Sequence, residues 1–480
     1  MTLLDAQALL PLLILAAGSA ILLLVISFFR NYTGAFALNL LIHAGALAAL
    51  IPASAVSSHA VAPLFVVDGF GLFFQGMILL ASLVVSSFAF DYFRKFHDTR
   101  EEFFILLLLA TLGAATLPVS NHFIAFFLGL ELLTVPLYAM VAYTLTRESS
   151  LEAGVKYLLL AAASSAFLLF GMALLYVETG QMEFPLVAVS MQAIRGIMGF
   201  GVILAGLAFI LVGIGFKLSL VPFHWWTPDV YQGAPAPVAA YLATVSKGAV
   251  VAVALRLAGD LDLASYPAAF SALGAIVFLS ILFGNLLALS QDNLKRLLAY
   301  SSIAHMGYLA IAFLAAPQAG VEAGTLYMVG YLFTSLGTFG IVCALSSSES
   351  EKQTLDDFRG LYWSRPILSG LLTLFMLSLA GIPLTAGFIG KFMIVAAGAQ
   401  NFQALLPLLI TLAAGSAIGL FYYLRVIWVL FQKQDAPASG HTFQLTFAGL
   451  VVVALAILFV GVYPSPLIEV MNQLAFGAGF

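Results

Sequence analysis

The sequence predicts an all-α membrane protein with fourteen transmembrane helices, of which two are discontinuous and ten form two inverted repeats. Of its 480 residues, 62% are hydrophobic and only 8% are charged, whereas a soluble domain is about 45–50% apolar and about 25% charged. Apolar stretches of about 20 residues, enough to cross a bilayer core about 30 Å thick, recur along the whole chain. These two observations exclude a water-soluble protein.

The fourteen apolar stretches are joined by short connections, so we expect a single membrane domain over residues 1–480. The first stretch begins with Asp5 rather than with basic residues and is too long for a cleaved signal peptide, so we expect it to remain as the first helix. The approximate limits are 8–29, 34–53, 70–93, 103–118, 121–145, 153–177, 197–222, 236–258, 268–290, 297–316, 322–346, 366–399, 403–432 and 443–463.

The orientation follows from the basic residues of the loops, because loops rich in Lys and Arg stay in the cytoplasm. One set of alternate loops holds only Arg195 and Arg256, so we expect both termini on the outer side of the membrane. The other set holds eleven basic residues: Arg30, Arg94, Lys95, Arg100, Arg147, Lys295, Arg296, Lys352, Arg359, Arg365 and Lys433.

Composition also excludes several kinds of site. The formal net charge is −4, with no basic block to neutralise phosphates, so nucleic-acid binding is excluded. Cys343 is the only cysteine, which rules out an intrachain disulfide, a thiolate-ligated cluster and a structural zinc site. Gly390-Lys391 lacks the other residues of a phosphate loop. We therefore expect no cofactor and no metal on this chain, and any electron chemistry on other chains.

The spacing of the apolar stretches repeats once. Stretches starting near 103, 121, 153, 197 and 236 have counterparts starting near 268, 297, 322, 366 and 403, which are offsets of 165 to 176 residues. Each unit has five crossings, an odd number, so the second copy must enter the membrane from the opposite face. The sequence therefore predicts two inverted repeats, residues 103–258 and 268–432.

Two equivalent stretches are interrupted by glycine and proline. In 197–222, glycines precede Lys217 and a proline ends the stretch, and in 366–399, Gly381 and Pro383 precede Lys391. Paired breaks at corresponding positions of two repeats point to a transport site at mid-depth. We therefore expect the seventh and twelfth helices to be discontinuous.

Four charges are predicted to lie deep in the membrane. Glu131 lies about ten residues into its helix, about 15 Å by helical rise, and is the only carboxylate so placed. Lys247 is equally deep, and Lys217 and Lys391 lie at the breaks. A buried ammonium costs several kcal/mol unless it has a partner, sits in a water-filled cavity or loses its proton. Three lysines cannot all pair with one carboxylate, which favours titrating lysines.

Other readings of these residues stay open. The four charges could form buried ion pairs that only fix helix packing. His305 suits a hydrogen-bonded core residue as well as a proton relay. His224, beside Trp225 in the first break, suits a functional residue, although aromatic helix ends also anchor proteins at the membrane interface. Residues of the two units share similar offsets: 174 for Lys217 and Lys391, 174 for Glu131 and His305, and 178 for Lys247 and Arg425.

Two further basic residues are expected to be peripheral. Lys156 lies near the start of its helix, one turn after Glu152, where an i,i+4 ion pair is favoured. Arg425 lies near the end of its helix, from which its side chain can reach the membrane interface.

Three motifs resemble the antiporter-like subunits of respiratory complex I, and the resemblance covers nearly the whole chain. The same superfamily includes subunits of multisubunit Na⁺/H⁺ antiporters and of membrane-bound hydrogenases. The motifs are Lys217-Leu-Ser-Leu-Val-Pro-Phe-His-Trp-Trp-Thr-Pro-Asp, with Lys247 following, Gln291-Asp-Asn-Leu-Lys-Arg-Leu-Leu-Ala-Tyr-Ser-Ser-Ile-Ala-His-Met-Gly-Tyr, and Gly381-Ile-Pro-Leu-Thr-Ala-Gly-Phe-Ile-Gly-Lys391.

The resemblance implies a non-redox subunit of a proton-translocating NADH:quinone oxidoreductase in a bacterial inner membrane. Glu131, Lys217, Lys247 and Lys391 match the functional places of that family. Lysine rather than glutamate on the twelfth helix, and no long C-terminal lateral helix, favour the subunit-N branch. FMN, iron–sulfur clusters and quinone are then expected on other chains, with subunits K and M and the lateral helix of subunit L as neighbours.

Two rival functions remain. A subunit of a Na⁺/H⁺ antiporter or hydrogenase would use the same lysines, but a hard cation needs oxygen ligands, and mid-membrane carboxylates are few. A passive scaffold or quinone-binding chain would explain the apolar surface but not the deep lysines.

Overall fold

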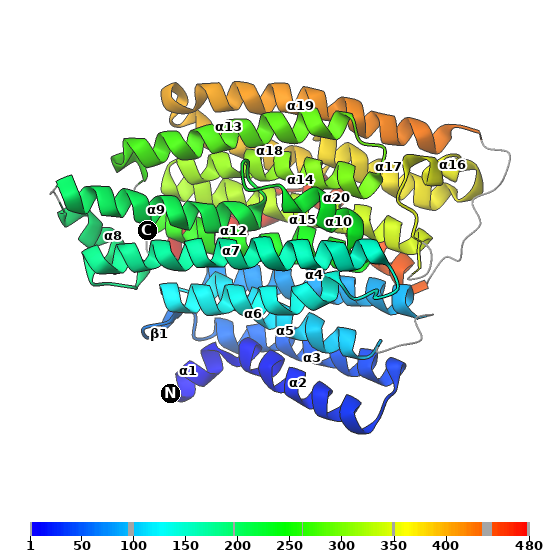
Figure 1. The fold of residues 1–480 in the computed structure, drawn as a ribbon, viewed down its shortest axis with the longest axis horizontal. Coiled ribbons are helices and arrows are strands. Elements are labelled where there is room, and N and C mark those ends of the chain that lie inside the picture. The colour runs from blue at the N-terminus through cyan, green and yellow to red at the C-terminus, as the bar shows by residue number, and fades with distance from the viewer. Residues whose placement is uncertain are drawn as a thin grey trace.

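The computed structural model describes residues 2–94, 100–194, 197–261, 263–347, 351–433 and 444–477. These residues form a bundle of long helices (Figure 1). Thirteen of the described helices are long and apolar enough to cross a membrane. In Figure 1 the first helix and the strand β1 lie at one end of the bundle, and the helix α16 lies at the other.

The membrane-length helices follow the predicted stretches closely. They are α2 (Leu10–Phe28), α3 (Tyr32–Ser54), α4 (Gly69–Phe93), α5 (Glu102–Thr116) continued by η1 (Leu117–Val119), α6 (Phe123–Val141), α7 (Glu148–Thr179), α9 (Ile197–Leu218), α11 (Ala236–Tyr241) continued by η2 (Leu242–Ser246) and α12 (Lys247–Asp260), α13 (Pro267–Leu289), α14 (Leu294–Ala310) continued by η4 (Ile311–Leu314), α15 (Pro317–Leu345), α19 (Phe402–Phe431) and α20 (Gln444–Val462).

The remaining elements are shorter than the membrane-length helices. They are α1 (Leu3–Ala8), the antiparallel strands β1 (His59–Val61) and β2 (Phe65–Val67), α8 (Phe184–Ala193), α10 (Trp226–Gly233), η3 (Leu263–Ser265), η5 (Leu355–Phe358), α16 (Leu361–Ser364), α17 (Pro366–Ala380), α18 (Ala386–Ala399) and α21 (Ser465–Gly477).

The structure confirms both predicted breaks. α9 ends at Leu218, and the chain turns through Ser219, which has a φ of 64°, before α10 begins. The predicted twelfth stretch is divided into α17 and α18 by a turn in which Gly381 and Leu384 have φ values of 83° and 72°. A left-handed residue stops an α-helix, and the proline in each turn has no N–H to continue it. The count of fourteen crossings and the two inverted repeats stay predictions.

Three spans form the core of the bundle. Within the described residues, the most apolar part of each of the spans 236–260, 294–314 and 317–345 is 100%, 94% and 89% buried. The same share is only 33–39% for outer spans such as α2, α13 and α19. Figure 1 shows α12, α14 and α15 in the middle, with α13 and α19 on one side and α5, α3 and α2 on the other. The polar residues of these three spans are therefore shielded from lipid by protein.

Two of the basic residues assigned above to loops are buried in helices. Lys295 is fully buried at the start of α14, and Arg256 is buried in α12, so both predictions of a loop position were wrong. Each is held by a carboxylate that sequence spacing did not indicate. Arg195 and Lys95 lie outside the described residues.

Candidate functional site

Lys217 lies in the last turn of α9 and points to α6. Its Nζ donates a hydrogen bond of 2.7 Å to Thr134 Oγ1 and lies 5.6 Å from the ring centroid of Tyr157. The side chain is buried. A hydroxyl and an aromatic face are weak partners for a buried ammonium.

Glu131 lies one helical turn before Thr134 on α6. Its Oε1 accepts a 2.6 Å hydrogen bond from Ser165 on α7, and the residue is half-buried. Glu131 and Lys217 form no ion pair in the described structure: the lysine and the carboxylate are bonded to separate hydroxyls. They remain neighbours, since Thr134 and Glu131 are three residues apart on the same face of a helix.

Lys247 begins α12 directly after the π-helical segment η2, a kind of helix distortion that is frequent at functional sites. Its Nζ donates to Ser302 Oγ at 2.6 Å and to the carbonyl oxygen of Leu218 at 3.3 Å. Leu218 follows Lys217 and ends α9. The last carbonyls of a helix have no partner within it and carry partial negative charge, which favours a cation. The first break therefore brings Lys247 beside Lys217.

A group of hydroxyls continues from Lys247 towards the second break. Ser302 and Tyr331 share a 2.6 Å hydrogen bond, and His305 bonds Tyr327 at 2.7 Å and Tyr423 at 3.0 Å. Between these rings lies a cavity of about 10 Å³, close to the space of one water. The cavity is lined by His305, Tyr327, Gly330, Tyr331, Thr334, Ser378, Leu379 and Gly387.

Lys391 repeats at the second break what Lys247 does at the first. From α18, its Nζ donates to the carbonyl oxygens of Leu379 at 3.2 Å and Ala380 at 2.9 Å, which end α17. Gly381 passes so close that a Cβ there would lie 3.1 Å from this nitrogen. Leu379, which accepts a bond from Lys391, lines the small cavity together with His305. His305 follows Ser302, the partner of Lys247, by three residues, so it lies between Lys247 and Lys391.

His224 is the one predicted site residue that stays apart from the others. Its ring stacks on Trp225 with centroids 5.0 Å apart, and in the described part of the chain no hydrogen bond joins it to a lysine of the site. It lies in the first break, as expected, but the geometry gives it no direct place among the lysines.

The hydroxyl partners of the lysines were not predicted from sequence, although a signal exists. Polar residues within otherwise apolar spans recur here at helical spacing: Thr134 three after Glu131, Ser302 three before His305, and Tyr331 four after Tyr327. Residues three or four apart share a helix face. Each pair therefore marks the side of a helix that turns towards the site.

The structure confirms the predicted i,i+4 pair of Lys156 and places Arg425 against the end of α13. Lys156 pairs with Glu152 at 2.7 Å and also with Asp229 at 2.8 Å, and its side chain is 42% exposed. Arg425 donates to the backbone carbonyls of Leu289 and Gln291 at the end of α13.

Substituting these two peripheral cations should have small effects. Exposed ion pairs contribute about 0–1 kcal/mol, so Lys156→Ala and Arg425→Ala should leave ion translocation by the assembled protein within about twofold of the parent. Vesicle flux assays measure this. A loss of about tenfold or more, the least expected from removing a proton-transfer group, would mean that the peripheral charges belong to the site.

The fold and the site define a class of protein. Lysines held at the broken ends of paired membrane helices, and joined by buried hydroxyls and a histidine, are the features of an antiporter-like membrane subunit. The chain belongs to the NADH:quinone oxidoreductase/Mrp antiporter transmembrane family, which matches residues 120–419.

Solved structures support the same assignment. A chain of respiratory complex I from Thermus thermophilus with bound aureothin is 34% identical, with 96% of this chain and 98% of that chain covered and a TM-score of 0.81. A chain of an archaeal membrane-bound sulfane sulfur reductase is 24% identical, with 98% and 97% covered and a TM-score of 0.85. A chain of the Mrp complex from Dietzia sp. is 17% identical, with 99% and 97% covered and a TM-score of 0.84. The last two share the fold.

Proposed function

We propose that this chain is a proton-translocating subunit of a bacterial NADH:quinone oxidoreductase, of the subunit-N type. One observation carries the proposal: Lys217, Lys247 and Lys391 are linked through the ends of two broken helices, with buried hydroxyls and His305 between them. Such an arrangement can hold protons and give them a route through the chain.

The route begins at the first break, where we expect water. Ser219 Oγ and Thr227 Oγ1 are buried and have no hydrogen-bond partner among the residues that the structure describes. An unsatisfied buried polar group costs about 1–3 kcal/mol, so ordered water is the expected partner. Such water would connect the break to Lys217 and to Lys247.

The charge of Glu131 controls the first step. A neighbouring carboxylate favours the protonated form of Lys217, whereas burial opposes it. When Glu131 and Lys217 move apart, the lysine releases its proton through water to Lys247. The hydroxyls of Ser302 and Tyr331 both donate and accept, so they can pass a proton on to the small cavity beside His305.

Lys391 is the last acceptor in this scheme. It receives the proton across the cavity and releases it from the second break to the outer side of the membrane. The outward direction, and the coupling to quinone reduction on other chains, rest on the family resemblance. Subunits K and M as neighbours, the lateral helix of subunit L, and FMN and iron–sulfur clusters on other chains are part of the same proposal.

A cation antiporter subunit or a hydrogenase subunit is the second candidate, and two observations make it weaker. The described residues contain no group of three or more His, Cys, Asp or Glu side chains that could hold a metal ion. Sequence identity is also higher to the chain from complex I than to the chain from the Mrp complex, 34% against 17%.

Purification of the intact assembly from its native membrane tests the proposal. Flavin and iron–sulfur subunits should co-purify with this chain, and NADH should drive quinone-dependent acidification of inverted vesicles. Recovery with a set of small membrane subunits alone, and cation-dependent proton flux without NADH, would instead establish the antiporter.

A further inference from the structure

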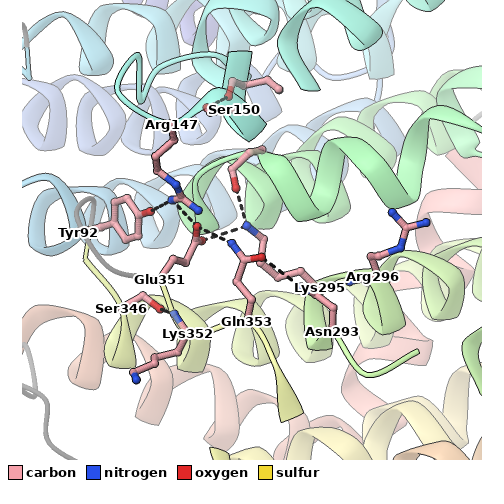
Figure 2. A network of polar contacts seen from close by, with 12 residues as sticks. Tyr92, Arg147, Ser150, Asn293, Lys295, Arg296, Ser346, Glu351, Lys352 and Gln353 are labelled. Carbon is pink, nitrogen blue, oxygen red and sulfur yellow. Dashed lines mark hydrogen bonds and ion pairs between the residues drawn. The ribbon is translucent and has the colours of Figure 1, made fainter. Parts of the chain in front are cut away.

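A second buried cluster of charges lies outside the lysine site, and Figure 2 shows it. Lys295 Nζ bonds Glu351 Oε1 at 3.0 Å, and the other oxygen of Glu351 bonds the Arg147 guanidinium at 2.6 Å. The side chains of Lys295 and Glu351 are 0% and 1% exposed. We call these three residues the charge triad.

The charge triad connects segments that are distant in the sequence. Arg147 follows α6 and also donates to the hydroxyl of Tyr92 on α4 at 3.2 Å. Glu351 precedes η5 and accepts from Gln353 at 3.2 Å. Burial acts to lower the pKa of Arg147, but Glu351 and Tyr92 outweigh it and raise this pKa, so Arg147 stays charged. Two cations thus share one carboxylate.

Stability alone does not explain such a cluster. Taking three charges out of water is costly, and apolar residues of the same shape often stabilise a fold as well or better. Buried charges instead hold neighbouring elements in one arrangement, because any other arrangement would leave a charge unpaired.

A second hydrogen bond of Lys295 shows which elements the charge triad aligns. Its Nζ also donates to the carbonyl oxygen of Ala234 at 2.5 Å, at the junction of α10 and α11. The chain that continues from Ala234 through α11 and η2 carries Lys247. Ser302, the partner of Lys247, lies seven residues after Lys295 on α14, two turns along the same helix face.

Two lysine bonds therefore cross between the same two segments of chain. In one, Lys295 of α14 reaches the backbone at Ala234, and in the other, Lys247 of α12 reaches Ser302 of α14. α10 also packs directly on α14. Movement of α14 at the first bond would therefore shift the hydroxyl that meets Lys247 at the second.

We propose that Lys295, held by Glu351 and Arg147, is a positioning residue that fixes α14 against the α10–α11 junction and thereby places Ser302 on Lys247. This inference rests on the proposed function. Neither Lys295 nor Glu351 takes part in proton transfer: they set the geometry in which Lys247 passes its proton on.

A double-mutant cycle on the assembled complex tests this role. Lys295→Met and Ser302→Ala should each lower proton translocation per electron about fivefold, and the double variant should fall no further than the lower single variant, because both act on one contact. Lys295→Arg retains donors for Glu351 and Ala234 and should restore more than half of the parental rate. Lys352→Met, which removes a 40% exposed cation beside Glu351, is the matched control and should change little.

The outcomes separate the inference from the proposed function. Multiplied losses in the double variant, or an unaffected Lys295→Met protein beside an impaired Ser302→Ala protein, would overturn the positioning role and leave the relay standing. Full activity in both Ser302→Ala and Lys247→Met would reject the relay itself. If Lys295→Met lowers the amount of assembled complex, Glu351→Asp replaces it, since it keeps all three charges and only retracts the carboxylate. Multiplied losses of Glu351→Asp with Ser302→Ala would again overturn the inference.

Discussion

Replacing Lys217 by methionine should remove most of the coupled proton translocation while leaving the subunit in its complex. Methionine fills a similar volume but carries no proton, and no other amine contacts Thr134 in the described residues. General acid–base groups contribute about 10²–10⁴-fold to rate, so translocation should fall at least about tenfold. Acidification of inverted vesicles, normalised to the amount of assembled complex, measures it.

A graded series makes this test specific. Thr134→Val removes the hydroxyl partner but keeps the amine, so it should lower translocation less than Lys217→Met does. Glu131→Gln, which is isosteric, should fall between the two because it removes only the charge that favours protonation. Normal pumping by fully assembled Lys217→Met protein would contradict the relay at its first step.

The helical architecture could be predicted because the bilayer imposes it. A spanning segment must satisfy every backbone group internally and must be apolar for about 20 residues. These constraints located the long helices, and the glycines and prolines near Lys217 and Lys391 located the two breaks. The ends of the helices were predicted less accurately. The seventh stretch was expected to reach residue 222, but α9 ends at Leu218 because the chain turns at Ser219.

The candidate site was predicted only in part. Counting residues along a helix gives the depth of a side chain, and it indicated that Glu131 and Lys247 are deep in the membrane. The helix breaks pointed to Lys217 and Lys391. Which side chains meet depends on how helices rotate and pack, which counting does not give. Counting residues therefore gave no sign that Thr134 is the hydrogen-bond partner of Lys217.

The same limit explains the misplaced cations. Lys295 and Arg256 lie near the ends of their spans, where basic residues usually reach water. Lys295 is buried because the segment before η5 folds over the start of α14 and brings Glu351 to it. A contact between residues so far apart in the sequence produces no periodic pattern from which it could be predicted.

Arg256→Met should destabilise the protein more than any surface substitution. The guanidinium bonds both oxygens of Asp68, at 2.8 and 2.9 Å, and the carbonyl of Pro118. Asp68 also caps α4 through the backbone N–H of Gly71 at 2.7 Å. These contacts tie α12 to the start of α4 and to η1. Removing one partner of a buried ion pair leaves the other charge uncompensated, which costs about 3–5 kcal/mol.

Arg30→Met is the matched control for this effect. Arg30 also pairs with a carboxylate, that of Glu102 at 2.9 Å, but its side chain is 65% exposed, against 6% for Arg256. An exposed pair contributes only about 0–1 kcal/mol. The thermal unfolding midpoint of the purified complex should therefore fall clearly for Arg256→Met and hardly for Arg30→Met. Adding Asp68→Asn to Arg256→Met should recover part of the loss, because no buried charge is then left unpaired. Equal midpoints for the two arginine variants would show that burial does not set the strength of the Arg256–Asp68 pair.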